Sequence, residues 1–153
     1  MPDTENKPLY FHEEFRHGID ESRRVMLPAR WRPKDPGVVF RVLPWPVAAH
    51  ACLLVLPPDR WDVMVEKLKL TKMQDPKVAA LERVLGGTSA ALTLDKVGRL
   101  CLPENLAKAA ALEREAVFVG RLDKFEIWCP ARYEVSTIQD KILAASVIDE
   151  IDL

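Results

Sequence analysis

Two short segments of the sequence share one polar spacing, an aspartate followed four positions later by an arginine. They are Asp20 with Arg24 and Asp95 with Arg99. An aspartate at the end of a strand accepts hydrogen bonds from backbone N–H groups of the following turn, or pairs with the arginine. Either arrangement orders the turn and limits how far the guanidinium swings. A guanidinium held in this way suits phosphate oxygens or the O6/N7 edge of guanine, through its bidentate donors.

The alternative for these segments is a turn-stabilising ion pair without a partner, which contributes little at an exposed site. Two observations favour nucleic acid instead. The spacing occurs twice, and further positive charge accompanies it at Arg23 and Lys96. The sequence therefore predicts DNA contacts in two turns.

Residue types that serve other chemistries lack the spacing that those chemistries need. The histidines of the chain are His12, His17 and His50, and its cysteines are Cys52, Cys101 and Cys129. The histidines have no Ser or Cys nucleophile pattern, metal-ligand spacing or catalytic carboxylate near them, and the sequence has no phosphate loop. Scattered cysteines fit small buried side chains in a reducing compartment. We therefore expect no enzyme activity, metal, cofactor or small-molecule ligand.

The formal net charge of −1 does not by itself indicate nucleic-acid binding. The distribution of charge matters more, because screening confines the relevant field to about 10 Å. Cations outnumber acids between positions 16 and 34, where they are Arg16, Arg23, Arg24, Arg30, Arg32 and Lys34. Acids collect elsewhere, at Glu13, Glu14, Asp149, Glu150 and Asp152. This distribution predicts a local basic face, with Arg16, Arg30 and Arg32 extending a phosphate track or remaining solvated.

The chain also lacks the pattern of a membrane protein. No stretch approaches the roughly 18 apolar residues that cross a bilayer, and no charged-then-apolar leader opens the sequence. We therefore expect a cytoplasmic protein.

Both turns belong to an internal repeat. Residues 19–28 align with residues 94–103 at an offset of 75, with Asp, Arg, Leu and Pro coinciding. Residues 58–61 align with residues 130–133 at an offset of 72. The first copy thus carries about three extra residues, which we assign to the Pro-Trp-Pro stretch at 44–46. Two matching blocks in the same order are hard to obtain by chance.

Each copy predicts the same order of elements. An apolar strand leads into the polar turn, and a second strand follows with alternating apolar residues. A proline then suits the first position of a short helix. Two more strands follow, at 38–43 and 51–56 in the first copy and at 116–120 and 124–128 in the second, and a helix closes each copy.

Apolar stripes mark the predicted helices. The first closing helix carries Trp61, Met64 and Leu68, and another helix runs from an Asp75 cap to a stop at Gly86 and Gly87. The last helix runs from about position 130 to 148, with a stripe of Val135, Ile138, Ile142 and Ala145. We expect core packing for these stripes. Subunit contacts are the alternative, because such small units often complete their cores against a neighbour.

The repeated motifs resemble those of MraZ, a family of bacterial transcription regulators. Residues 94–103 and 124–128 resemble its second half, and residues 19–24 and 27–31 its first. The resemblance implies an α+β fold of two pseudo-symmetric AbrB-like swapped-hairpin β-barrel halves with flanking helices. Their bounds would be residues 10–86 and 87–148. It also implies a ring of subunits and association with the nucleoid.

The resemblance further implies sequence-specific binding to double-stranded DNA. The sites would be short repeats upstream of the division and cell-wall gene cluster, the protein's own promoter included. Arg24 and Arg99 would contact the DNA, while Asp20, Asp95 and Gly98 would support the turns.

The first turn departs from the family pattern. The family usually has a Lys and then a Gly inside the turn, and Ser22 and Arg23 stand there in this copy. Without the glycine the turn lacks a residue that takes positive φ without strain. The shape of the first turn, and with it the DNA preference, is left open. We expect Arg24 to remain a contact and Arg23 to become a new one.

Two other functions remain as alternatives, an AbrB-like oligomeric scaffold and an antitoxin-type protein, each with weak or altered DNA binding. An antitoxin usually follows its DNA-binding unit with a disordered toxin-binding tail. This chain instead has a second complete unit and a helix predicted to be ordered.

Overall fold

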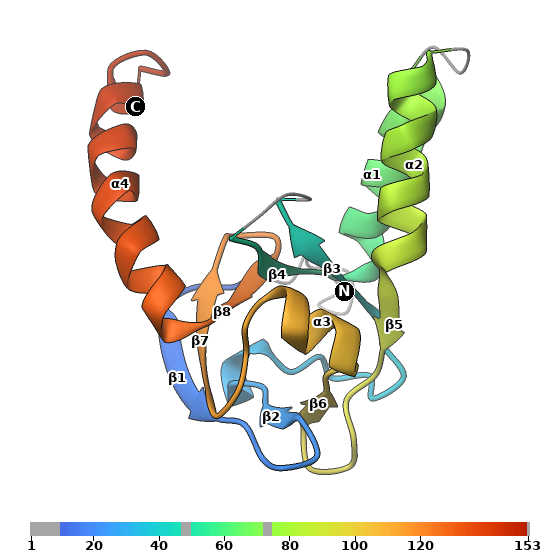
Figure 1. Cartoon of the computed structure of the whole chain (residues 1–153), viewed down its shortest axis with the longest axis vertical. Coiled ribbons are helices and arrows are strands. Elements are labelled where there is room, and N and C mark those ends of the chain that lie inside the picture. The colour runs from blue at the N-terminus through green and yellow to red at the C-terminus, as the bar shows by residue number, and fades with distance from the viewer. Residues whose placement is uncertain (1–9, 47–49, 72–74, 153) are drawn as a thin grey trace, which may run out of the picture.

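The computed structural model describes residues 10–46, 50–71 and 75–152. The strands are β1 (Glu14–Gly18), β2 (Arg24–Met26), β3 (Phe40–Trp45), β4 (Cys52–Leu56), β5 (Ala90–Leu92), β6 (Arg99–Cys101), β7 (Glu115–Gly120) and β8 (Phe125–Trp128). The α-helices are α1 (Pro58–Leu70), α2 (Pro76–Thr88), α3 (Glu104–Ala109) and α4 (Pro130–Ile148), and a 3-10 helix spans Ala29–Trp31. The protein is thus an α+β protein (Figure 1), and the predicted strands are confirmed with ends shifted by at most two residues.

The described strands form a six-stranded antiparallel sheet, in the order β1-β7-β8-β4-β3-β5, and a two-stranded ribbon of β2 with β6. The two sequence repeats exchange strands in this arrangement. The first strand of the first repeat pairs with β7, placing Phe15 opposite Phe118. The first strand of the second repeat, β5, pairs with β3, placing Leu92 opposite Phe40. β1 and β5 are the two edges of the sheet, but β2 and β6, which follow their turns, pair with each other and so join the two repeats a second time.

One hydrophobic core joins both repeats. The residues predicted to alternate inward on the two ribbon strands, Val25, Leu27, Leu100 and Leu102, have no exposed surface. Trp31 lies among the aromatic rings of this core, 5.0 Å from Phe125 and 5.6 Å from Phe11 between ring centroids. The strands next to the turns are therefore held rigidly, because their inward side chains are closely packed in the core.

Several local expectations need correction. The strand before the first turn, β1, is not apolar; it alternates exposed with half-buried residues because it is an edge strand with one solvated face. Gly86 and Gly87 do not end their helix, since α2 continues to Thr88 and the Ser89 N–H still bonds to the Leu85 carbonyl at 3.2 Å. The predicted Asp75 cap is confirmed by a 2.9 Å bond from the Lys77 N–H.

The prolines after the ribbon strands also differ from expectation. Pro103 precedes α3 as its capping residue, and Pro28 leads only into a 3-10 helix. The second proline therefore lies one position before the helix that it was expected to open, and the first repeat has no α-helix there.

The α4 stripe is not part of the core, contrary to the expectation. Val135, Ile138 and Ile142 are each about two-thirds exposed. The first turns of α4 are attached to the rest of the fold, where Arg132 donates to the carbonyls of Ala51, just before β4, and of Ala109 on α3. Figure 1 shows α4 rising away from the sheet as an arm, separate from the arm formed by α1 and α2. The described part of the chain therefore leaves this stripe uncovered, as the alternative of subunit contacts would require.

The three cysteines differ in burial. Cys52 is buried, and burial raises the pKa of its thiol. Cys129 is half-buried, but Cys101 is exposed. The expectation of buried cysteines is wrong for Cys101, because its strand β6 faces the core only through Leu100.

Candidate nucleic-acid interface

The two Asp-x-x-x-Arg turns have the same hydrogen bonds. In the first, Asp20 Oδ1 accepts from the backbone N–H of Ser22 at 2.9 Å and of Arg24 at 2.8 Å. Asp20 Oδ2 accepts from Arg24 Nε at 2.8 Å. In the second, the Asp95 oxygens accept from the N–H of Val97 at 3.1 Å, of Arg99 at 2.9 Å, and from Arg99 Nε at 2.8 Å.

Each aspartate therefore supports its turn in both of the ways that the sequence suggested, through backbone N–H groups and through the arginine. The backbone closes both turns alike. Asp20 N–H bonds to the Arg24 carbonyl at 3.1 Å, and Asp95 N–H bonds to the Arg99 carbonyl at 2.9 Å.

These contacts fix the charge state of both carboxyls. The backbone N–H of Arg24 is the largest cause that lowers the pKa of Asp20, and the N–H of Arg99 does the same for Asp95, with the ion pairs adding to it. A carboxylate that accepts several hydrogen bonds is stabilised in its charged form. Both aspartates are therefore ionised at neutral pH, and each holds its arginine by Nε.

The first turn keeps the shape of the second although it lacks the glycine. Gly98 has φ of 92°, and Arg23 at the matching position has φ of 60°. The left-handed conformation costs about 1–2 kcal/mol in a residue with a Cβ. Arg23 compensates with a side-chain bond across the ribbon, in which its Nε donates to the Leu102 carbonyl at 3.0 Å. Its own carbonyl accepts from the Leu102 N–H at 2.9 Å, and Gly98 makes the equivalent backbone bond in the second turn. The open question about the turn shape is thereby answered.

A second arginine fills the matching place beside Gly98. Arg32 Nε donates to the Leu27 carbonyl at 3.0 Å, and the Leu27 N–H bonds to the Gly98 carbonyl at 2.9 Å. A Cβ added at Gly98 would lie 2.6 Å from Arg32 Nε. The two ends of the ribbon are thus closed by one guanidinium each, supplied by Arg23 at one end and by Arg32 at the other.

Sequence reasoning missed this role of Arg32. The signal was present in the repeat: at the offset of 75, Arg23 aligns with Gly98, and Arg32 aligns with Ala107. Both arginines therefore come from the first copy, and each aligns with a small residue of the second copy.

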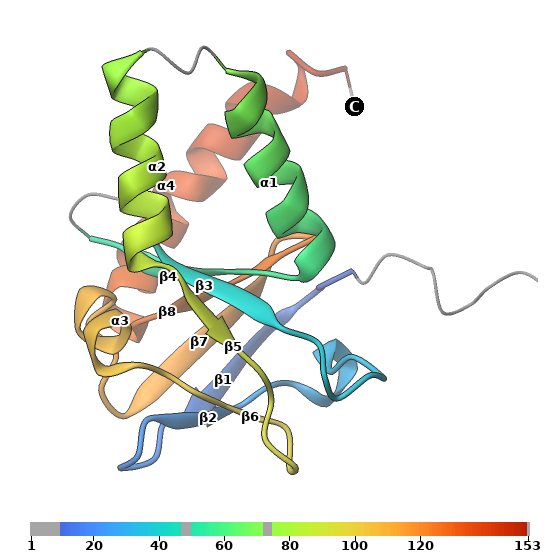
Figure 2. The ribbon, with the colours of Figure 1, turned by 90° about the vertical axis from the view of Figure 1, so that its right-hand side faces the viewer.

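The ribbon places both turns at one end of the molecule. β2 and β6 are antiparallel, with Arg24 opposite Cys101 and Arg99 opposite Met26. Figures 1 and 2 show both turns at the end of the molecule opposite to α1, α2 and α4, and Figure 2 shows them apart, one at each end of the ribbon. The side chains of Arg24 and Arg99 are 41% and 31% exposed. Each guanidinium is therefore accessible to solvent although its Nε is bound to an aspartate.

The other predicted contacts have mixed surroundings. Lys96 is exposed in the second turn, whereas Arg23 uses its Nε within the ribbon. Arg16 on β1 pairs with Glu115 at 3.5 Å, and the exposed Arg30 pairs with Glu13. The structure thus brings Lys96 and Arg23 together with the two turn arginines, while Arg16 and Arg30 each carry an acidic partner.

The arrangement defines a class of protein, an α+β protein of two strand-exchanging repeats that presents a pair of matched arginine turns. A family model of MraZ proteins, whose description proposes a likeness to antitoxins, matches residues 85–150. The "Transcriptional regulator MraZ" of Thermomicrobium roseum is 34% identical over 137 residues, which is 88% of this chain and 90% of that protein.

Other relatives of the same name agree. That of Natranaerobius thermophilus is 31% identical, over 92% of this chain and 96% of its own length. That of Desulfitobacterium hafniense strain DCB-2 is 36% identical, over 79% and 82%. The chain belongs to the MraZ family. None of the helices that the structure describes is long and apolar enough to cross a membrane.

Proposed function

We propose that this protein is a transcription regulator that binds double-stranded DNA through its two Asp-x-x-x-Arg turns. The names of its relatives support regulation of transcription. The observation that carries the DNA contact is the pair of turns itself, formed by matching hydrogen bonds and placed at the two ends of one ribbon. Arg24 and Arg99 are the proposed principal contacts.

The chemistry of contact follows from how each arginine is held. Its Nε is bound to an aspartate oxygen at 2.8 Å, which orients the guanidinium before DNA arrives. The two amino groups of the same guanidinium then supply the parallel donors that phosphate oxygens or guanine O6/N7 accept. Little side-chain freedom remains to be lost on binding, which favours affinity.

The proposal extends to assembly. The two repeats, with bounds at residues 10–86 and 87–148, would be AbrB-like swapped-hairpin halves, and copies of the chain would form a ring. One pair of turns makes few phosphate contacts and binds weakly at physiological salt. Several copies engaging spaced repeats at once raise avidity by orders of magnitude without a new contact. The proposed sites are repeats upstream of the division and cell-wall gene cluster, where occupancy of the promoter would regulate transcription.

The test is binding to a DNA fragment from upstream of the protein's own gene, followed by fluorescence anisotropy across a salt series. We expect wild type to bind selectively, Arg24→Ala and Arg99→Ala to bind more weakly, and the double variant not to bind, each with an unchanged oligomer mass. Lys108→Ala is the matched control, because Lys108 on α3 is exposed and pairs only with Glu104 among the described residues.

Two results would count against this function. Equal, salt-insensitive behaviour of all the variants would leave an oligomeric scaffold. Loss of DNA binding in Arg99→Ala but not in Arg24→Ala would restrict the DNA contact to the second turn.

A further inference from the structure

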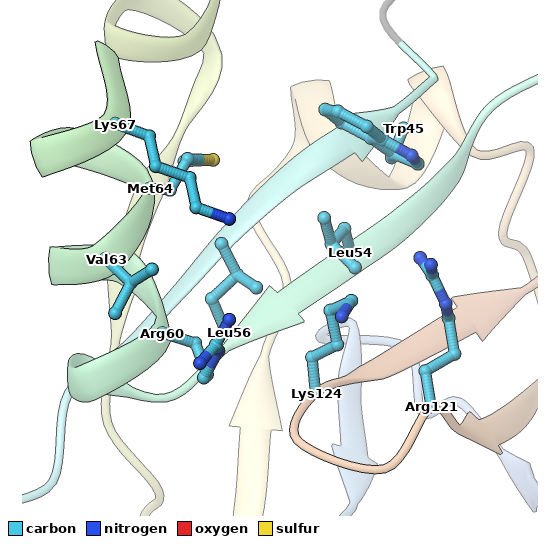
Figure 3. Close-up of a pocket in the computed structure, with 9 residues that line it drawn as sticks. All are labelled: Trp45, Leu54, Leu56, Arg60, Val63, Met64, Lys67, Arg121 and Lys124. Atoms are coloured by element: carbon cyan, nitrogen blue, oxygen red, sulfur yellow. The ribbon is translucent and has the colours of Figure 1, made fainter. Parts of the chain in front are cut away.

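A basic pocket lies on the side of the sheet away from the turns. It has a volume of about 200 Å³, is open to solvent, and is lined by α1, the strands β3 and β4, and the turn between β7 and β8. Figure 3 shows Lys67 on one side of the hollow, Arg121 and Lys124 on the other, and the aliphatic side chains of Leu54 and Leu56 between them. Its floor is apolar and its rim is positively charged.

The charges at the rim are only partly compensated within the chain. Asp123 pairs with both Arg60 and Lys124, each at 2.9 Å. Arg121 pairs with Glu126 at 3.0 Å. Lys67 pairs with no acid in the part of the chain that the structure describes. Four lining cations thus share two acids, and the pocket suits a ligand that combines carboxylates with an aliphatic side chain.

The end of α4 has this composition. Asp149, Glu150 and Asp152 surround Ile151, which is 58% exposed. The helix before them carries an uncovered aliphatic face that continues to Val147 and Ile148. An apolar face of this length on a soluble chain marks a surface that contacts a partner. Acidic charge and aliphatic side chains are therefore presented together on a free arm.

The chain cannot place this segment in its own pocket. Figure 1 shows α4 and α1 in separate arms, with the C-terminal end of α4 far from the sheet. We propose that the pocket receives residues 149–152 of a second copy, with Ile151 over Leu54 and Leu56 and the carboxylates against Lys67 and Arg121. The contact joins different surfaces of the two copies, so its repetition builds a ring or a filament. The contact between two copies is argued independently of the proposed function. Only the statement that the copies close into a ring rests on that proposal.

The test is a charge exchange read by light scattering after size-exclusion chromatography. We expect wild type to be oligomeric, and Lys67→Glu and Glu150→Lys each to lower the mass. The combined variant should recover the wild-type mass, because the exchanged pair attracts again. Lys108→Glu is the control for charge reversal at an exposed helical lysine and should leave the mass unchanged. Circular dichroism and thermal unfolding confirm that each variant is folded.

A second measurement uses the unaltered sequence. ¹⁵N-labelled and unlabelled protein are mixed and treated with a zero-length carbodiimide, which joins an amine to a carboxylate in direct contact. We expect cross-links from Lys67 or Lys124 to residues 149–152 that connect labelled with unlabelled chains. Cross-links of these residues within one chain only would overturn the proposal.

Three results of the charge exchange would also overturn it. They are a monomeric wild type, an unchanged mass for Lys67→Glu, and a combined variant that stays dissociated. Lys67→Glu with full mass but weakened DNA binding would assign the pocket to DNA. DNA binding is measured separately by anisotropy, so failure of this contact is distinguishable from failure of the proposed function.

Discussion

Arg23 and Gly98 occupy the same left-handed position in the two turns, and each lies beside an arginine-to-carbonyl bond that closes the ribbon. At Gly98 the guanidinium comes from Arg32, which lies where a Cβ would otherwise be. At Arg23 the residue supplies the guanidinium itself. The loss of the glycine is therefore compensated within the same residue, and the first turn remains able to present Arg24.

Replacing Arg23 separates backbone strain from the side-chain bond. Arg23→Ala and Arg23→Gly both lose the bond to Leu102, but only alanine keeps a Cβ at φ of 60°. We expect the glycine variant to be more stable than the alanine variant by about 1 kcal/mol, measured by urea unfolding. An alanine variant of equal or greater stability would show that the left-handed conformation is not maintained.

Gly98→Ala introduces a Cβ into space that Arg32 occupies. We expect a loss of stability of about 2–3 kcal/mol, since left-handed strain adds to the broken bond between Arg32 and the Leu27 carbonyl. In an Arg32→Ala background the same substitution should cost less, because the clash is gone. Equal costs in the two backgrounds would contradict the contact between Arg32 and Gly98.

The two turn aspartates make the stability of the fold depend on acid pH. The pKa of each lies below the ordinary value of 3.8, so each stabilises the folded state above that pH and ceases to do so as pH falls through the lowered value. We expect the double variant Asp20→Asn/Asp95→Asn to lose less stability than wild type as the pH falls below about 4. Parallel pH profiles for the two proteins would contradict the ionised, hydrogen-bonded state of the carboxyls.

The turns differ in charge at their second position, where Glu21 in the first aligns with Lys96 in the second. If both turns contact DNA, Glu21→Lys adds a cation beside the phosphates. We expect tighter binding and a salt dependence of affinity steeper by about one phosphate contact per turn engaged, whereas Lys96→Glu should have the opposite effect. Glu82→Lys, an exposed change on α2 at the end of the molecule opposite to the turns, should leave the salt dependence unchanged.

The sequence was sufficient to predict the repeat, the strands and the two turns, because each follows from local spacing. Val25 and Leu100 each begin an alternation of apolar residues on a short strand, and Asp20 and Asp95 stand four positions before their arginines. Each of these patterns involves residues only a few positions apart. The structure they predict can therefore be inferred without knowing any tertiary contact.

The remaining features depend on contacts between distant residues. Arg23 bonds to Leu102, which is 79 positions away, and no local pattern contains that pair. The same limit applied to α4: a helical stripe such as Ile138 and Ile142 shows which face is apolar but not what covers it. The basic pocket combines α1 with the β7–β8 turn and was equally hidden.

The central claim is that the ribbon of β2 and β6 faces DNA, and Cys101 allows a direct measurement. Its thiol is exposed and its residue lies opposite Arg24 in the ribbon, whereas Cys52 is buried. An iron–EDTA reagent attached to Cys101, in a Cys129→Ser background, cleaves DNA only near the point of attachment. The same reagent on Lys108→Cys in a Cys101→Ser/Cys129→Ser background is the control. We predict cleavage at the promoter repeats from Cys101, or loss of binding caused by that label alone. A Cys101 conjugate that binds the promoter normally and leaves it uncut would contradict the account.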